Sequence, residues 1–300
     1  MRAVTSIATL LVLAFAPSAK AQQPPIPVID VHMHEPGAKA MPEYLTAMDE
    51  LNVQKSILIG TPLQWEGGPG RPDRFLPSLM FPCGEGKAPN IGFKCFADGS
   101  EFPPVEEIRK LAEAGKLKAL GEINAQYIGV APDDPRLEPY YALAEELDLP
   151  VGIHIGIGPP GSAYVDRPGF PPRKSPKYSI TAGDVTALEK VLVRHPKLRL
   201  YVMHAAWPFR EAMIYMLYMH PQLMVDVSVL QWAIPRPAYY SYLKDLVDAG
   251  FADRIMFGSD GGPKHLRAGV AAILAAPFLT DAQKKSILHD NAARFFKLPK

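Results

Sequence analysis

The chain alternates short apolar runs with longer stretches in which apolar residues recur every three or four positions. Several short runs are almost continuous in valine, isoleucine and leucine, which indicates strands of a parallel sheet that helices cover on both faces. The predicted strands are residues 27–32, 55–60, 91–96, 117–123, 150–155, 198–204, 223–228 and 254–258. The pattern therefore predicts the α/β fold class.

An internal repeat narrows the choice of architecture. Residues 194–200 and 219–225 both read x-His-Pro-x-Leu-x-apolar, so that in each a histidine ends a helix and a strand begins shortly after the proline. Eight predicted strands with intervening helices in 300 residues favour a single-domain (β/α)8 TIM-type barrel. The alternative is a doubly wound open sheet, but no Gly-x-Gly-x-x-Gly follows the first predicted strand.

The N-terminus resembles a secretory signal peptide. Arg2 precedes an apolar run at 7–15, and Ala19-Lys20-Ala21 fits the small-x-small rule for cleavage before Gln22. The run is too short to span a bilayer, so we expect no stable membrane insertion after cleavage. The sequence predicts a signal peptide over 1–21, a barrel domain over 22–300, and a periplasmic or secreted protein.

Charge and cysteine content limit the partners and the redox chemistry. Lys plus Arg total 32 and Asp plus Glu total 31, so the chain has no excess positive charge for nucleic acid and a small-molecule substrate is expected. The oligomeric state stays open. Cys83 and Cys95 form a disulfide or remain two buried thiols, and the sequence does not decide between these alternatives.

Polar residues gather where predicted strands end. In a barrel the carboxyl ends of the strands carry the active site. His32 and His34 are two positions apart, so both project to one side with Cα atoms about 6.6 Å apart. A single such histidine is usually a core residue bonded to a backbone carbonyl, but several at one barrel mouth point to a metal site. The candidate ligands are His32, His34, Glu122, His154, His204 and Asp260.

The chemistry of these ligands indicates the type of metal. Imidazole and carboxylate together suit Zn²⁺ or a comparable divalent ion such as Mn²⁺, and no thiolate belongs to the set. The other histidines are given structural roles, except that His265, in the loop after the last predicted strand, could reach the barrel mouth.

Three segments resemble a known family. They are Ile29-Asp30-Val31-His32-Met33-His34, Phe257-Gly258-Ser259-Asp260 and Asn291-Ala292-Ala293-Arg294. Together with the single histidines after the fifth and sixth strands, they resemble the metal-dependent amidohydrolase superfamily, in the amidohydrolase-related branch that includes aminocarboxymuconate semialdehyde decarboxylase. The resemblance runs from about residue 28 to residue 296 and is poorly specific for substrate.

The resemblance implies roles for these residues. His32 and His34 would bind a first metal with Asp260 nearby, while His154 and His204 would bind a second metal or, with one ion, complete its shell and polarise the substrate. Glu122 would bridge two ions where the family often has a carboxylated lysine. The alternative for Glu122 is an ion pair with an arginine, so one or two ions are expected.

A metal-dependent enzyme is the function that these roles imply. A divalent ion activates water and polarises a substrate carbonyl, and the resemblance makes Asp260 the proton acceptor and donor. The first interpretation is a hydrolase of an amide, lactone or ester bond, with Asp260 and His204 as catalytic residues. The alternatives are a non-oxidative decarboxylase and, more distantly, a non-enzymatic metal-binding protein. Specificity is expected from loops at 61–89, 156–178 and 205–210.

Overall fold

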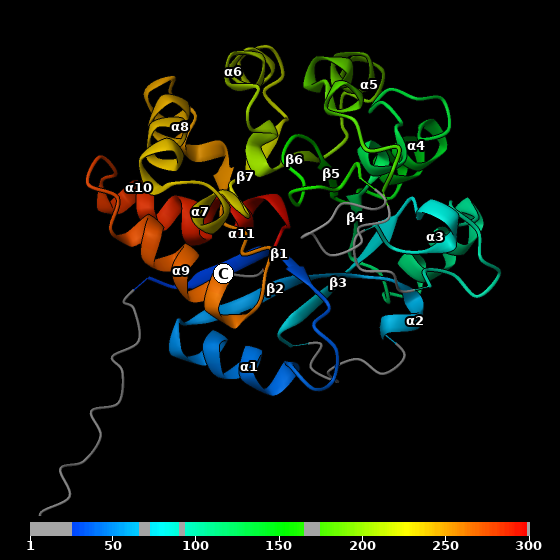
Figure 1. Cartoon of the computed structure of the whole chain (residues 1–300), viewed down its shortest axis with the longest axis horizontal. Helices are drawn as coiled ribbons and strands as arrows, with labels where there is room; N and C mark the ends of the chain where they lie inside the picture. Colours follow the sequence, from blue (N-terminus) through cyan, green and yellow to red (C-terminus); the bar gives the residue numbers. More distant parts are fainter. Residues whose placement is uncertain (1–25, 66–72, 90–93, 165–174, 299–300) are drawn as a thin grey trace, which may run out of the picture.

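A computed structural model describes residues 26–65, 73–89, 94–164 and 175–298; the predicted signal peptide lies outside these ranges. Eight parallel strands form one sheet in sequence order, and Figure 1 shows the helices arranged around them. The strands are β1 (Val28–His34), β2 (Val53–Gly60), β3 (Phe75–Phe81), β4 (Ala119–Ile123), β5 (Val151–His154), β6 (Leu200–Met203), β7 (Met224–Asp226) and β8 (Ile255–Met256).

The sheet curls until its two edges almost meet. The backbone nitrogen of Val31 in β1 donates to the carbonyl of Phe257, directly after β8, at 3.0 Å. A second bond of 2.7 Å runs from the nitrogen of Asp260 to the carbonyl of His32. The result is a nearly closed (β/α)8 barrel, which confirms the predicted fold.

Helices fill the connections between successive strands. Proline occupies the first turn of α1 and α9, where its missing N–H costs nothing, and a Thr280–Gln283 capping box begins α10. The helices are α1 (Met41–Glu50), α2 (Pro62–Trp65), α3 (Val105–Glu113), α4 (Glu138–Glu146), α5 (Leu188–Arg194), α6 (Arg210–Met219), α7 (Leu230–Ala233), α8 (Arg236–Asp248), α9 (Pro263–Leu274), α10 (Asp281–Lys285) and α11 (Asn291–Phe295).

The prediction for the third strand is wrong. β3 lies at Phe75–Phe81, inside the range expected to be a loop, and not at 91–96. Of the predicted range only 94–96 is described, and there Lys94 forms an isolated bridge with Lys87. The reason is Pro77, which argues against an inner strand because it has no N–H for the ladder. Its carbonyl still accepts from the Lys118 nitrogen at 2.9 Å.

The connection after β3 carries the two cysteines. Cys83 and Cys95 form a disulfide, with their Cα atoms 6.4 Å apart. The structure thus selects the disulfide from the two alternatives that the sequence leaves open. None of the helices in the described ranges is long and apolar enough to cross a membrane.

Candidate metal centre

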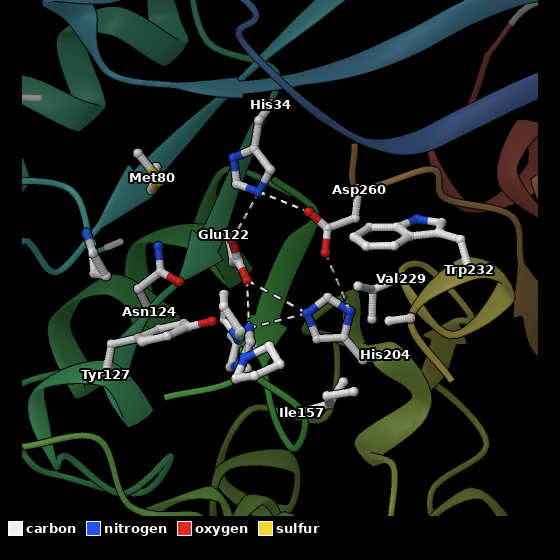
Figure 2. A pocket seen from close by; sticks show the side chains of 16 residues that line it. His34, Met80, Glu122, Asn124, Tyr127, Ile157, His204, Val229, Trp232 and Asp260 are labelled. Carbon is white, nitrogen blue, oxygen red and sulfur yellow. Dashed lines mark hydrogen bonds and ion pairs between the residues drawn. The ribbon is translucent and has the colours of Figure 1, made fainter. Parts of the chain in front are cut away.

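All six predicted ligands lie together at the carboxyl end of the barrel. β1 contributes His32 and His34, β4 contributes Glu122, and His154 is the last residue of β5. Of the remaining two, His204 follows β6 directly, and Asp260 lies four residues after the last residue of β8. Figure 2 shows four of them, His34, Glu122, His204 and Asp260, turned toward one another. That they bind a metal stays a prediction.

One group of donor atoms centres on the two histidines of β1. The Nε2 atoms of His32 and His34 are 3.4 Å apart. Glu122 Oε2 lies 3.2 Å from His34 Nε2 and 3.9 Å from His32 Nε2. Asp260 Oδ1 lies 3.3 Å and 3.6 Å from the same two nitrogens. Two imidazole nitrogens and two carboxylate oxygens therefore converge on one small space.

A second group uses the other oxygen of Glu122. His154 Nδ1 lies 2.5 Å from Glu122 Oε1, and His204 Nε2 lies 3.7 Å from the same oxygen. The two imidazole nitrogens are 3.0 Å apart. Glu122 therefore stands between two donor groups and faces each with a different oxygen.

The backbone around these ligands is unusual. Gly121 has φ +139°, and a Cβ there would lie 2.6 Å from the carbonyl oxygen of Gly152, so only glycine can precede Glu122 in this conformation. His204 and Asp260 have φ values of 58° and 46°, and residues other than glycine rarely adopt such positive values. Such strain often accompanies functional sites.

The ligands alter one another's pKa values. Burial lowers the pKa of His32 and His34, but the nearby carboxylates outweigh it and raise the two values to about 9 and about 10. Burial raises the pKa of Glu122, yet the donating imidazoles, first that of His154, hold it well below its ordinary range. The pKa of Asp260 is also lowered, because the charges of His32 and His34 exceed the effect of burial. Both carboxylates are therefore ionised at neutral pH.

The donor set fits a divalent cation. Two imidazole nitrogens that face each other at 3.0 or 3.4 Å need a cation or a shared proton between them. Three overlapping groups of ligand atoms are close enough to hold an ion: His32, His34 and Glu122; His32, His204 and Asp260; and Glu122, His154 and His204. Nitrogen and oxygen ligands of this kind suit Zn²⁺ or Mn²⁺.

Two further residues support the site, and the sequence prediction missed both. Asp226, the last residue of β7, is fully buried, and His32 Nδ1 donates to its Oδ2 at 3.1 Å. Ser228 Oγ lies 3.0 Å from His32 Nδ1 and 2.9 Å from His204 Nδ1. The two residues alternate along the chain exactly as His32 and His34 do, and this spacing is the signal that could have found them.

A pocket of about 500 Å³ opens above the ligands. Tyr127 and Trp232 are its aromatic walls, and the sequence prediction missed them too (Figure 2). His265 does not line it but stacks against Trp232, with the ring centroids 4.1 Å apart. Within the described residues the lining contains no lysine or arginine: it is His34, Met80, Pro89, Glu122, Asn124, Tyr127, His154, Ile157, Gly158, Pro159, Pro160, His204, Val229, Trp232, Ala233 and Asp260.

The predicted specificity loops contribute unequally to this pocket. Pro89 comes from 61–89, and Ile157 to Pro160 come from 156–178. Trp65 and Trp207 do not line it. Three cationic residues of the 156–178 loop, Arg167, Arg173 and Lys174, lie outside the described residues, and Arg210 of the 205–210 loop does not line the pocket.

A parallel barrel that gathers imidazoles and carboxylates around a pocket at its carboxyl end has the architecture of a TIM-barrel enzyme. A family model described as Amidohydrolase matches residues 29–298. The chain belongs to this amidohydrolase family, which confirms the resemblance found in the sequence. The family contains both hydrolases and non-oxidative decarboxylases and typically uses a divalent metal.

Solved structures share the fold at low sequence identity. An uncharacterised TIM-barrel protein from Bordetella bronchiseptica is 16% identical with a TM-score of 0.65, covering 91% of this chain and 99% of that one. A probable 2-pyrone-4,6-dicarboxylic acid hydrolase from Acinetobacter baumannii is 15% identical with a TM-score of 0.61, covering 90% and 99%. The 5-carboxyvanillate decarboxylase from Sphingomonas paucimobilis is 16% identical with a TM-score of 0.58, covering 91% and 100%. No curated protein matches the sequence.

Proposed function

We propose that the protein is a metal-dependent hydrolase that cleaves an amide, lactone or ester bond of a small molecule. The observation that carries the proposal is the position of Glu122, whose two oxygens face two separate groups of imidazole nitrogens. A carboxylate so placed suits a bridge between two ions, and two-ion sites are widespread among hydrolases. The residues that would hold the ions are His32, His34, Glu122, His154, His204 and Asp260, with Zn²⁺ as the first candidate and Mn²⁺ as the second.

The ions would supply Lewis acidity, and the chain supplies the proton chemistry. Asp260 is ionised, lines the pocket and keeps 19% of its side chain exposed. Its Oδ2 lies 3.8 Å from His204 Nδ1. Asp260 is therefore placed to accept a proton from a water molecule in the pocket and to return it to the leaving group. His204, whose ring also lines the pocket, would orient the substrate carbonyl.

The pocket lining indicates the kind of substrate that this hydrolase would bind. Tyr127 and Trp232 offer flat aromatic faces, and Met80, Ile157 and Val229 add apolar surface. Burial of such surface favours an aromatic or apolar group beside the reacting bond. Asn124 is a neutral polar residue of the lining whose amide is available to hydrogen-bond to a substrate oxygen.

A non-oxidative decarboxylase is the second candidate. Structures with the same fold include the 5-carboxyvanillate decarboxylase and a 2,6-dihydroxybenzoate decarboxylase, and aromatic walls would also suit an aromatic acid. We favour the hydrolase because the two oxygens of Glu122 face two separate groups of imidazole nitrogens.

Two experiments test the proposal. Purified protein should contain at least one equivalent of a divalent ion, and His32→Ala/His34→Ala should lose it; a metal-free, fully active protein would refute the metal-dependent mechanism. Once screening of N-acyl amino acids, lactones, esters and aromatic carboxylates finds a substrate, the reaction is run in ¹⁸O-labelled water. Label in the product carboxylate supports hydrolysis, whereas CO₂ release with no label in the organic product supports decarboxylation.

We also propose that the protein is exported to the periplasm or secreted. The signal-like N-terminus carries this proposal, and the Cys83–Cys95 disulfide supports it because disulfides persist in oxidising compartments.

A further inference from the structure

The buried carboxylate of Asp226 receives hydrogen bonds on both oxygens. Its Oδ1 accepts from the backbone nitrogens of His204 and Ser228 at 3.0 and 2.9 Å. Ser228 Oγ donates to the same oxygen at 2.5 Å. The other oxygen, Oδ2, accepts from His32 Nδ1 at 3.1 Å. Asp226 therefore contacts a ring nitrogen of one predicted ligand and the strained backbone of another.

The hydroxyl of Ser228 lies between the rings of His32 and His204. Because its single proton goes to Asp226, the oxygen can only accept from the two Nδ1 atoms, at 3.0 and 2.9 Å. The other atoms near His204 Nδ1 are also acceptors: the Ser228 carbonyl at 3.3 Å and Asp260 Oδ2 at 3.8 Å. Both histidines must therefore carry a proton on Nδ1.

A proton on Nδ1 fixes the role of the opposite nitrogen. In a neutral imidazole with Nδ1–H, the lone pair is on Nε2. Nε2 of His32 faces His34 and Asp260, and Nε2 of His204 faces His154 and Glu122. Asp226 and Ser228 thus orient one predicted ligand in each group, His32 in the first and His204 in the second.

The other two histidines of the site differ in this respect. Within the described part of the chain, the buried atoms His34 Nδ1 and His154 Nε2 have no hydrogen-bond partner. The support from β7 is therefore selective for His32 and His204.

From this geometry we propose that Asp226 and Ser228 are positioning residues that hold His32 and His204 as Nδ1–H tautomers, so that Nε2 of each ring is available to a metal ion. Ser228 also determines which donor group His204 joins. Because His204 Nδ1 donates to the Ser228 hydroxyl, this nitrogen cannot bind an ion beside Asp260. His204 instead presents Nε2 to Glu122 and His154. The inference rests on the proposed metal site.

The test compares metal affinity in Ser228→Ala and wild-type protein. Each protein is freed of metal and titrated with Zn²⁺ against a chromophoric chelator. Loss of a partner that orients a metal-binding histidine typically weakens metal binding about 10- to 100-fold, and we expect a loss of this size. Asp226→Asn replaces an acceptor with an amide and should have an effect at least as large. Ser56→Ala is the matched control, because Ser56 is a fully buried strand serine outside both the pocket and the donor groups.

A spectroscopic readout separates positioning from a general loss of stability. In zinc-loaded protein labelled with ¹⁵N-histidine, the Nδ1–H signals of His32 and His204 should be protected from solvent exchange. Ser228→Ala should shift the His204 signal or abolish its protection, whereas Ser56→Ala should leave it unchanged. Assignment uses single His→Gln variants.

The outcomes distinguish this inference from the proposed function. Wild-type affinity and an unchanged His204 signal in Ser228→Ala would overturn the positioning role and leave the metal site intact. Weaker binding with an unchanged signal would overturn it as well, because the loss would then come from elsewhere. A wild-type protein that binds no divalent ion would overturn both the proposed function and this inference.

Discussion

Glu122→Gln tests the central feature of the site, a carboxylate shared by two donor groups. The substitution hardly changes side-chain volume, so its effect comes from charge and from the loss of one oxygen. Glu122 Oε2 faces His34 at 3.2 Å and Oε1 faces His154 at 2.5 Å. The amide of glutamine has a single oxygen. One of the two groups of imidazoles therefore keeps a neutral oxygen ligand, whereas the other faces an NH₂ group, which cannot bind a cation. Metal content should fall from two equivalents to one.

The remaining ion should also bind more weakly. A hydrogen bond to a charged group contributes about 1.5–3 kcal/mol, which we take as the scale for the lost charge, and each 1.4 kcal/mol is a factor of ten in affinity. Replacing the carboxylate by a neutral amide should therefore cost the remaining ion about 10- to 150-fold in affinity. Metal content is measured by plasma emission after dialysis against metal-free buffer, and affinity by competition with a chelator.

Glu145→Gln is the matched control. Glu145 also accepts from an imidazole, His195 Nδ1 at 3.0 Å, but it lies on α4, outside the pocket. It should retain the metal content of the wild type. Two equivalents bound to Glu122→Gln with wild-type affinity would refute the bridging role, and one equivalent in the wild type would refute the two-ion arrangement itself.

Three further predictions follow from other parts of the chain. Asp260→Asn should keep much of the metal yet lower kcat about 10²-fold or more, because the ionised proton acceptor is gone; steady-state kinetics on the identified substrate check this, and near-normal kcat would exclude Asp260 as the proton carrier. Cys83→Ser/Cys95→Ser opens a short loop and should lower the free energy of unfolding by about 3 kcal/mol; urea denaturation measures it, and an unchanged midpoint would contradict the stabilising role. Protein from the native host should begin at or near Gln22, and N-terminal sequencing that reads Met1 would rule out export by cleavage.

The barrel was predictable from the sequence because seven of the eight predicted strands overlap strands of the structure, and several of them are apolar enough to be buried on both faces. β3 was not, because Pro77 and Ser78 interrupt its apolar pattern. Neighbouring strands compensate: Ser78 Oγ donates to the Gly121 carbonyl at 2.7 Å, and Lys118 donates to Pro77. The sequence of the strand alone does not predict these contacts with residues that are distant in the chain.

The six ligands were predictable for a different reason. Each is a polar residue at the end of an apolar strand, and barrel topology brings such ends together. Asp226 and Ser228 obey the same rule at the end of the predicted strand 223–228, so the same reasoning could have found them as well. Tyr127 and Trp232 lie in the connections after β4 and β7. The position of a residue in such a connection does not predict whether its side chain points into the pocket.

The number of ions is the property that spacing alone could not provide. Glu122 and His34 lie on strands three places apart in the sheet, and their contact at 3.2 Å crosses the barrel interior. Whether His154 approaches Glu122 with Nδ1 or Nε2 depends on how its ring is turned, which no residue pattern encodes. His154 Nδ1 faces Glu122 Oε1, whereas His34 Nε2 faces Glu122 Oε2, so the two oxygens contact different groups of imidazoles. Binding of two ions is the arrangement that uses every ligand atom of the site. Metal stoichiometry, and not residue identity, is therefore the measurement that separates the one-ion and two-ion forms of this site.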